Sequence, residues 1–192
     1  MQKAEKIVLH GDISVIPTNG FRDCEELETI VLPSSITVIQ DYAFMGCSML
    51  QIVNMPSSLE CLESGVFWGC KSLSQLYMPE SLSKLGDHCF FECENLRTIR
   101  IPSKIEEIPW DAFRNCLNLA EIVLPSKVPG FAIGAFERCP IQNILIYGNA
   151  TKQTRRSLRR KARNGLFGSF VADNCDSSIV FEQENETDKE SV

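Results

Sequence analysis

The sequence lacks the features that would place the protein among membrane proteins or the common enzyme classes. No apolar run approaches the roughly 18 residues of a membrane-spanning helix. Histidine is scarce, with two residues in 192, and no Cys-x-x-Cys pair is present, which argues against a zinc site. No glycine-rich loop is present that would hold a nucleotide phosphate. The sequence therefore predicts neither a metal ion nor a cofactor.

The N-terminal sequence also lacks the pattern of a secretory signal peptide. Its apolar stretch is interrupted by His10, Gly11 and Asp12. We therefore expect the nine cysteines to be reduced thiols in an intracellular protein, cytoplasmic or nuclear. A surface location is expected only if the chain is a fragment that lacks its export signal.

One pattern recurs along residues 1–150. Phenylalanine and cysteine each return six times at a spacing of 23 residues. The two columns are Phe21, Phe44, Phe67, Phe90, Phe113 and Phe136, and Cys24, Cys47, Cys70, Cys93, Cys116 and Cys139. Residues 1–20 form a partial repeat, and residues 136–150 form a decayed one. The spacing lies within the roughly 20–29 residues of leucine-rich repeats.

Each repeat contains three kinds of local pattern. The segment L-x-x-I-x-L-P alternates apolar and other residues before a proline, which predicts a short strand parallel to that of the next repeat. The segment S-S-I-x-x-I predicts a short extended run on the opposite side, and D-x-A-F-x-x-C-x-x-L predicts a single helical turn. Stacking buries the apolar residues of one coil against those of the next. The expected fold is a leucine-rich repeat solenoid with short parallel β-strands on a concave face.

The full pattern, L-x-x-I-x-L-P-x-x-I-x-x-I-x-x-x-A-F-x-x-C, resembles the BspA-type leucine-rich repeat over about residues 5–148. Pro, Ala-Phe and Cys all fall in place in repeats such as 30–47 and 99–116. Val66 and Cys89 replace the Ala that precedes Phe. The resemblance implies a binding and adhesion scaffold without catalysis of its own. Relatives on cell surfaces usually carry an export signal or a membrane anchor.

Charge changes sharply after residue 150. Residues 151–172 hold seven basic and no acidic residues in a chain of net charge −6. We expect a short helix here that covers the open end of the solenoid with an apolar side including Leu158 and Ala162. Residues 173–192 are polar and acidic, and we expect them to be a disordered tail.

The variable, outward-facing positions of the strands are the first candidate binding site. One column holds Val31, Asn54, Tyr77, Arg100, Val123 and Ile146, and its neighbour holds Thr29, Ile52, Gln75, Thr98, Glu121 and Ile144. Tyrosine and arginine are common among the residues that dominate binding energy. We predict that a protein partner contacts Asn54, Gln75, Tyr77, Thr98 and Arg100. The alternative is a solvent-exposed face without a ligand.

The basic residues of the expected helix are the second candidate site. They suit the phosphates of nucleic acid, acidic lipids or a nuclear import receptor. No aromatic residue interleaves with them, which argues against a stacking platform for single strands. The alternative is that the helix only caps the solenoid. The candidates are Lys152, Arg155, Arg156, Arg159, Arg160, Lys161 and Arg163.

No catalytic arrangement stands out, and we predict that the protein is not an enzyme. Cys89 adjoins His88, but adjacent residues on an extended backbone point in opposite directions. The cysteine column is expected to fill the core as small apolar residues, rather than to bind metal or form disulfides. Cys61, Cys89 and Cys175 lie outside the column and have no assigned role, and only Cys175 is expected to be reactive.

The leading interpretation is a non-catalytic scaffold that binds a protein through the concave face. One alternative is polyanion binding or nuclear targeting through residues 152–163. Another is a fragment of a surface adhesin, which the family resemblance permits.

Overall fold

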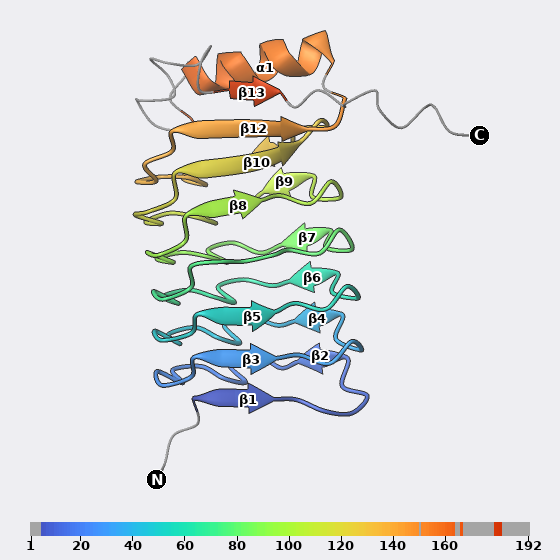
Figure 1. Cartoon of the computed structure of the whole chain (residues 1–192), viewed down its shortest axis with the longest axis vertical. Coiled ribbons are helices and arrows are strands. Elements are labelled where there is room, and N and C mark those ends of the chain that lie inside the picture. The colour runs from blue at the N-terminus through green and yellow to red at the C-terminus, as the bar shows by residue number, and fades with distance from the viewer. Residues whose placement is uncertain (1–4, 150, 164–165, 167–178, 182–192) are drawn as a thin grey trace, which may run out of the picture.

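A computed structural model describes residues 5–149, 151–163, 166 and 179–181. The chain forms a parallel-strand solenoid whose coils stack along the long axis of the molecule (Figure 1). Each complete coil contributes to three sides, which we call the long-strand face, the short-strand face and the turn side. The predicted solenoid of short parallel strands is confirmed.

The long-strand face holds the strands expected before the proline position of each repeat, and one further strand, β13, that the sequence did not predict. They are β1 (Lys6–Val8), β3 (Thr29–Val31), β5 (Ile52–Asn54), β8 (Thr98–Arg100), β10 (Glu121–Pro125), β12 (Asn143–Tyr147) and β13 (Ile179–Phe181). They form two parallel sheets, in the orders β1-β3-β5 and β13-β12-β10-β8. The central residue of β3, β5 and β8 points into the core, as Ile30 and Ile99 do, whereas its neighbours face outward.

The short-strand face holds the extended runs predicted on the opposite side. They are β2 (Val15–Ile16), β4 (Val38–Ile39), β6 (Cys61–Leu62), β7 (Lys84–Leu85), β9 (Glu107–Ile108) and β11 (Gly130–Phe131). They pair in the orders β2-β4-β6-β7 and β11-β9. Gly86 follows β7, and a Cβ there would meet the backbone of Glu63 and Ser64 in the preceding coil. The absence of a side chain at Gly86 therefore permits close contact between these coils.

The turn side replaces the expected single helical turn with a run of tight turns. Two positions in each repeat have left-handed backbone, with φ between 51° and 75° in all twelve cases. They lie two residues before and two residues after the stacked phenylalanine. The columns are Asn19, Tyr42, Gly65, His88, Asp111 and Gly134, and Asp23, Gly46, Gly69, Glu92, Asn115 and Arg138. The left-handed residues interrupt any helix and turn the chain onward to the next strand.

A continuous set of backbone hydrogen bonds joins the turns of neighbouring coils, and we call it the turn ladder. Three bonds cross each of the five junctions, donated by the two left-handed residues and by the phenylalanine between them. At one junction, for example, the N–H groups of His88, Phe90 and Glu92 donate to carbonyls 22 residues further on, at 2.8–3.0 Å. The turn ladder runs without a break from residue 19 to residue 137.

The core beneath the turn side is a stack of phenylalanine rings. Successive rings from Phe21 to Phe136 lie parallel, with centroids 5.1–5.5 Å apart. This spacing is close to the roughly 4.8 Å between neighbouring strands, so the rings and the backbone repeat together. Four of these rings, Phe44, Phe67, Phe90 and Phe113, are fully buried.

The ladder of the long-strand face is interrupted at residues 74–77. Among the described residues, no backbone hydrogen bond joins this segment to β5 or β8. Its inward residue, Leu76, still lies in the core, but the same column elsewhere holds β-branched residues, which favour strands. The short-strand face is also interrupted, between β7 and β9. The turn ladder is complete at both places.

The last repeat has lost one residue. In the parallel pair β10–β12, Asn143 lies opposite Glu121, one position short of the 23-residue spacing. The loss falls after Cys139, where Ile141 takes the buried place that Leu119 holds in the preceding repeat. Every later residue of this repeat is therefore shifted by one relative to the pattern.

This shift changes which residues of β12 face outward. Ile144 and Ile146 are fully buried, and Leu145 lies between them with its side chain partly exposed. The prediction that Ile144 and Ile146 belong to the outward columns is therefore wrong. A one-residue shift exchanges the two faces of a strand. It also places Tyr147 opposite Pro125, in the proline column.

The helix α1 (Lys152–Arg163) lies across the C-terminal end of the solenoid (Figure 1). Leu158 and Ala162 lie four residues apart on one side of the helix, and both are fully buried in the common core. The Thr151 hydroxyl accepts a hydrogen bond from the Thr154 N–H at 3.1 Å, which caps the first turn.

The strand β13 continues the long-strand face beyond the repeats. It pairs in parallel with β12, and Ile179 is buried beside Ile144. The sequence predicted disorder for residues 173–192, and β13 is an exception to that prediction. Its three residues pair in register with β12, and the apolar side chain of Ile179 is buried there. The rest of that segment, with Cys175, lies outside the described residues.

Candidate functional site

The long-strand face carries all five residues that the sequence predicts to contact a partner. Each has an exposed side chain, and that of Tyr77 is 67% exposed. Asn54 ends β5, Thr98 and Arg100 begin and end β8, and Gln75 and Tyr77 lie on the interrupted segment between them. Ile52 of β5 is another large exposed apolar residue on this face, at 57%.

The Arg100 guanidinium has a fixed environment. Its Cζ lies 3.7 Å from the centroid of the Tyr147 ring, and its Nε lies 3.9 Å from Oε1 of Glu80. The Tyr147 hydroxyl donates a hydrogen bond to the Ile101 carbonyl at 2.9 Å. Arg100 therefore stands between an aromatic ring and a carboxylate, which limits the directions in which it can point.

Tyr147 and Glu80 belong to this site but were not predicted from the sequence. Burial, and then the Glu80 carboxylate, raise the pKa of the Tyr147 phenol, so it remains a hydrogen-bond donor at neutral pH. The signal for Tyr147 was the shortened spacing after Cys139, which moves a large aromatic residue into the proline column. Glu80 directly follows Pro79 and had no comparable signal.

A pocket of about 580 Å³ opens on the long-strand face beside the interrupted segment. One wall comes from residues 72–76 and the other from residues 95–100, which belong to successive coils. Every lining side chain is uncharged except those of Arg97 and Arg100. Sequence reasoning missed Arg97, because it lies just before the alternating part of the strand.

The structure describes the side chains of six of the seven basic candidates at the C-terminus, and four of these six are exposed. Lys152, Arg155, Arg156 and Arg160 have exposed side chains on α1. Arg159 and Lys161 are partly buried, and the side chain of Arg163 lies outside the described residues. No acidic residue lies in the first turn of the helix, so its positive dipole end is not balanced there.

Lys161 points back toward the solenoid. Its Nζ lies 3.5 Å from the Pro129 carbonyl oxygen and 4.7 Å from the centroid of the Phe131 ring. Burial, with the nearby Arg160 charge, lowers the pKa of the Lys161 ammonium. These contacts make Lys161 a docking residue of the helix, and it presents less of its charge to solvent than its neighbours do.

The cysteine column has a role beyond filling space. Five thiols, from Cys47 to Cys139, each donate to the carbonyl of the phenylalanine 26 residues earlier, at 2.9–3.2 Å. Burial raises the pKa of the Cys47 thiol to about 12, and it raises that of Cys70 well above its usual value. The eight described cysteines are free, and these buried thiols are poor nucleophiles and poor metal ligands.

The neighbouring pair Cys89 and His88 does not form a nucleophile and base. Cys89 is fully buried, and burial raises its pKa well above the usual value. His88 is a left-handed residue of the turn side that stacks on Trp68, with centroids 5.5 Å apart. Cys61 is partly exposed, but burial raises its thiol pKa as well.

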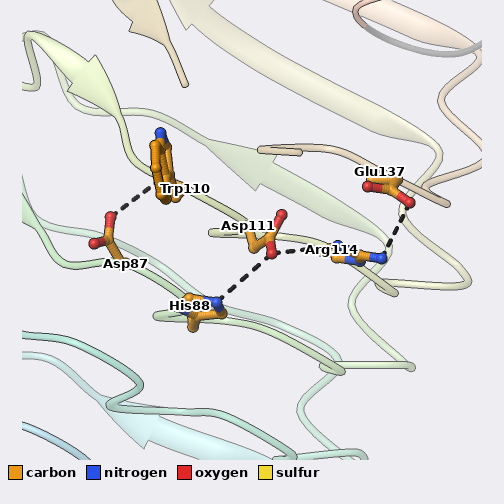
Figure 2. A network of polar contacts seen from close by, with 6 residues as sticks. All are labelled: Asp87, His88, Trp110, Asp111, Arg114 and Glu137. Atoms are coloured by element: carbon orange, nitrogen blue, oxygen red, sulfur yellow. Dashed lines mark hydrogen bonds and ion pairs between the residues drawn. The ribbon is translucent and has the colours of Figure 1, made fainter. Parts of the chain in front are cut away.

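His88 takes part in a polar network on the turn side (Figure 2). Its Nε2 lies 3.6 Å from Oδ2 of Asp111, and the same oxygen lies 3.4 Å from Nη1 of Arg114. Arg114 Nη2 continues the network to Oε1 of Glu137 at 3.2 Å. The links from His88 to Asp111 and from Arg114 to Glu137 join turn residues of successive coils, whereas the Asp111–Arg114 link lies within one turn, and together they indicate a structural role for the network.

Neither a metal-binding cluster nor a membrane-spanning helix is found in the part of the chain that the structure describes. No group of three or more His, Cys, Asp or Glu side chains there is placed to hold a metal ion. Of the helices described, none combines the length and the apolar character needed to cross a membrane.

Comparison with known families and structures agrees with the geometry of the coils. Residues 14–143 match six copies of the family described as "BspA type Leucine rich repeat region". One similar solved structure is the crystal structure of the T. pallidum leucine-rich repeat protein TpLRR, which is 27% identical to this chain, with a TM-score of 0.69. That similarity covers 88% of this chain and 87% of TpLRR.

Two larger proteins share the fold. A leucine-rich repeat protein from Bacteroides ovatus is 23% identical over 74% of this chain, with a TM-score of 0.62. The pneumococcal vaccine antigen PcpA is 18% identical over 94% of this chain, with a TM-score of 0.68. The chain spans 43% and 42% of the lengths of these two structures. No curated protein is significantly similar to the chain in sequence.

Proposed function

Because the chain belongs to the BspA-type leucine-rich repeat family, we propose that it is a non-catalytic scaffold that binds a protein partner through its long-strand face. The observation that carries this proposal is the set of large side chains exposed between buried ones. Ile52 on β5 and Tyr77 on the interrupted segment are both more than half exposed, although the inward residues next to them, Val53 and Leu76, are buried. Apolar and aromatic groups held at such positions supply much of the energy of protein interfaces.

The rigidity of the face supports the same proposal. Arg100 is already held by Tyr147 and Glu80, so binding it would cost little side-chain entropy. Asn54, Gln75 and Thr98 lie around it as exposed hydrogen-bonding groups. The surface thus combines two apolar anchors, a fixed cation and neutral polar groups, a composition typical of protein interfaces.

A capture experiment tests the role of this face. The wild-type protein and the double variant Ile52→Ser, Tyr77→Ala would be immobilised and exposed to protein from the source cells. We expect the double variant to lose partners that the wild type retains. The control is Trp110→Ala, which removes an aromatic residue that is 60% exposed but lies outside the long-strand face. Equal capture by the double variant and the wild type would exclude this face.

A second candidate function is polyanion binding by α1. Lys152, Arg155, Arg156 and Arg160 are exposed, and the first three lie near the positive end of the helix dipole, while Leu158 and Ala162 anchor the other side of the helix. Nuclear targeting through residues 152–163 would use the same cations. The test measures binding to heparin and to vesicles containing phosphatidylserine at increasing salt. We expect binding that falls steeply with salt and is lost when the four cations become Gln, and the absence of binding at low salt would exclude it.

The place of the protein in the cell remains a separate proposal. The comparisons do not support the intracellular location expected from the sequence, and the family resemblance permits a surface adhesin. Brief protease treatment of intact source cells distinguishes the two: loss of the protein indicates the surface, and protection indicates the interior.

A further inference from the structure

The interruption at residues 74–77 leaves backbone groups without ladder partners on an otherwise regular face. In the described part of the chain, neither β5 nor β8 forms backbone hydrogen bonds with this segment. Because Ser74, Gln75 and Tyr77 are exposed, the amide and carbonyl groups of this segment are accessible to water or to another chain. A segment of another chain laid across the face could form hydrogen bonds with some of them. The interruption therefore marks one place on the long-strand face as different from the rest.

A pocket with two positively charged side chains opens beside the interrupted segment. The 580 Å³ pocket lies between this segment and the next coil, with Leu76 in its lining and Arg97 and Arg100 as its only charged side chains. The chain as a whole has a net charge of −6, so a pocket with two cations and no lining carboxylate contrasts with the rest of the molecule. Its charge is complementary to an anion.

The two arginines are held in different ways. The backbone of Arg97 is fixed, because its carbonyl accepts hydrogen bonds from the N–H groups of Ala120 and Glu121 at 3.0 and 3.2 Å. Arg100 is oriented by Tyr147, and its nearest carboxylate, that of Glu80, lies 3.9 Å away. At that distance Glu80 leaves donors of the Arg100 guanidinium available to another group.

We propose that this pocket receives an acidic side chain from an extended segment of a protein partner, an inference that rests on the proposed function of the long-strand face. Arg97 and Arg100 bind the carboxylate, because guanidinium groups pair with carboxylates through charge-assisted hydrogen bonds. Gln75 and Thr98 form hydrogen bonds with the main chain of the partner's segment. The residues on either side of the acidic one pack against Ile52 and Tyr77.

A polypeptide carboxylate fits these surroundings better than a free anion does. Guanidinium groups also bind phosphate, so the two arginines alone do not separate the two ligands. The exposed Ile52 and Tyr77 side chains beside the pocket offer apolar contacts that inorganic phosphate cannot use. A short peptide with an acidic residue among apolar ones uses both the cations and the apolar surface.

An unbiased selection tests the proposal. A phage-displayed library of random dodecapeptides would be selected on the immobilised wild-type protein, and the most enriched peptide would be measured by fluorescence anisotropy. We expect Asp and Glu to be at least about twofold more frequent than in the unselected library. We also expect the affinity to fall at least about tenfold in the double variant Arg97→Gln, Arg100→Gln. Excess inorganic phosphate is expected to compete only weakly.

A charge-matched control separates the pocket from general electrostatics. The double variant Lys104→Gln, Lys127→Gln removes the same charge from exposed residues outside the pocket, and it should keep nearly the wild-type affinity. Selected peptides without an acidic excess, equal weakening in both double variants, or full displacement by phosphate would each overturn the proposal. If Ile52→Ser, Tyr77→Ala loses its cellular partners while Arg97→Gln, Arg100→Gln keeps them, the face binds a partner and only the acidic specificity is wrong.

Discussion

Three backbone hydrogen bonds cross every junction on the turn side from residue 19 to residue 137, whereas the long-strand ladder is missing on both sides of residues 74–77. Both sides are built from the same repeats. On the turn side, the stacked phenylalanines and the thiol-to-carbonyl bonds reinforce the ladder at every coil. The comparison indicates that the turn side holds the coils together, and this allows the long-strand face to vary and to open.

The largest expected loss of stability comes from a substitution on the turn side, and it tests whether this side contributes more to the unfolding free energy than the long-strand face does. Phe90 stacks between two other rings and is fully buried, so Phe90→Ala should cost about 3–5 kcal/mol of unfolding free energy. Leu76→Ala, at the interruption, should cost about 2 kcal/mol, because the pocket already admits solvent beside it. Urea unfolding of both variants gives the two values, and equal costs would contradict the comparison.

A control at the end of the stack sharpens this prediction. Phe21 has a ring neighbour on one side only among the stacked phenylalanines, and its side chain is partly exposed. We expect Phe21→Ala to cost clearly less than Phe90→Ala, because a smaller cavity forms and solvent can fill it. Identical losses at the two positions would mean that stacking between coils does not set the cost.

A substitution on the short-strand face should lower the stability by an intermediate amount. A Cβ at Gly86 would meet the backbone of Glu63 and Ser64, so Gly86→Ala should destabilise the protein by about 1–3 kcal/mol through overpacking. Gly130→Ala is the matched control, since a Cβ there would make only ordinary contacts, the nearest at 3.5 Å from Glu107 Cγ. Thermal unfolding should separate the two variants, and similar midpoints would show that the coils can move apart at Gly86.

Hydrogen exchange tests the interruption without a mutation. Amides of residues 75–77 should be protected at least about tenfold less than those of residues 29–31, which pair with strands on both sides. Exchange followed by nuclear magnetic resonance resolves the two segments. Similar protection in both would show that the long-strand ladder is closed in solution, and it would remove the basis for a special site at residues 74–77.

The smallest expected effect concerns the left-handed positions of the turn side. Glu92 has φ of 59°, a conformation that costs a residue with a side chain about 1 kcal/mol relative to glycine. Glu92→Gly should therefore stabilise the protein by up to about 1 kcal/mol. The control, Glu94→Gly, changes a residue that is not left-handed and removes the 2.9 Å ion pair with Lys71, so it should destabilise slightly. Chemical denaturation gives the change in unfolding free energy of both variants, which should be positive for Glu92→Gly and negative for Glu94→Gly.

Much of the core followed from the repeat alone. The spacing of Phe90 and its equivalents predicted the stacked rings, and the alternation around Ile99 predicted which strand residues point inward. The left-handed columns were missed because their residue types vary. Tyr42, His88 and Arg138 stand in the same columns as glycine and asparagine, and only a column-by-column comparison reveals Gly65 and Gly134 at equivalent places.

The candidate site was predictable only in part. Asn54, Gln75, Tyr77, Thr98 and Arg100 were placed on the correct face because outward positions alternate with buried ones. Arg97 was missed because it lies outside the alternating segment, and Tyr147 was missed because a single lost residue moved it into the proline column. The position of Leu76 in the β-branched column was a visible signal for the interruption, although it did not specify a pocket.

The sequence by itself determined the period, the parallel stacking and the division of β3, β5 and β8 into inward and outward residues. These properties depend on local alternation and on identical neighbours in successive coils, so one repeat predicts the next. Only the tertiary structure decided where the long-strand ladder opens, how Tyr147 orients Arg100 across 47 positions of sequence, and that β13 extends the long-strand face beyond the repeats. These features depend on contacts between positions that differ from the repeat, and the repeating pattern carries no information about them.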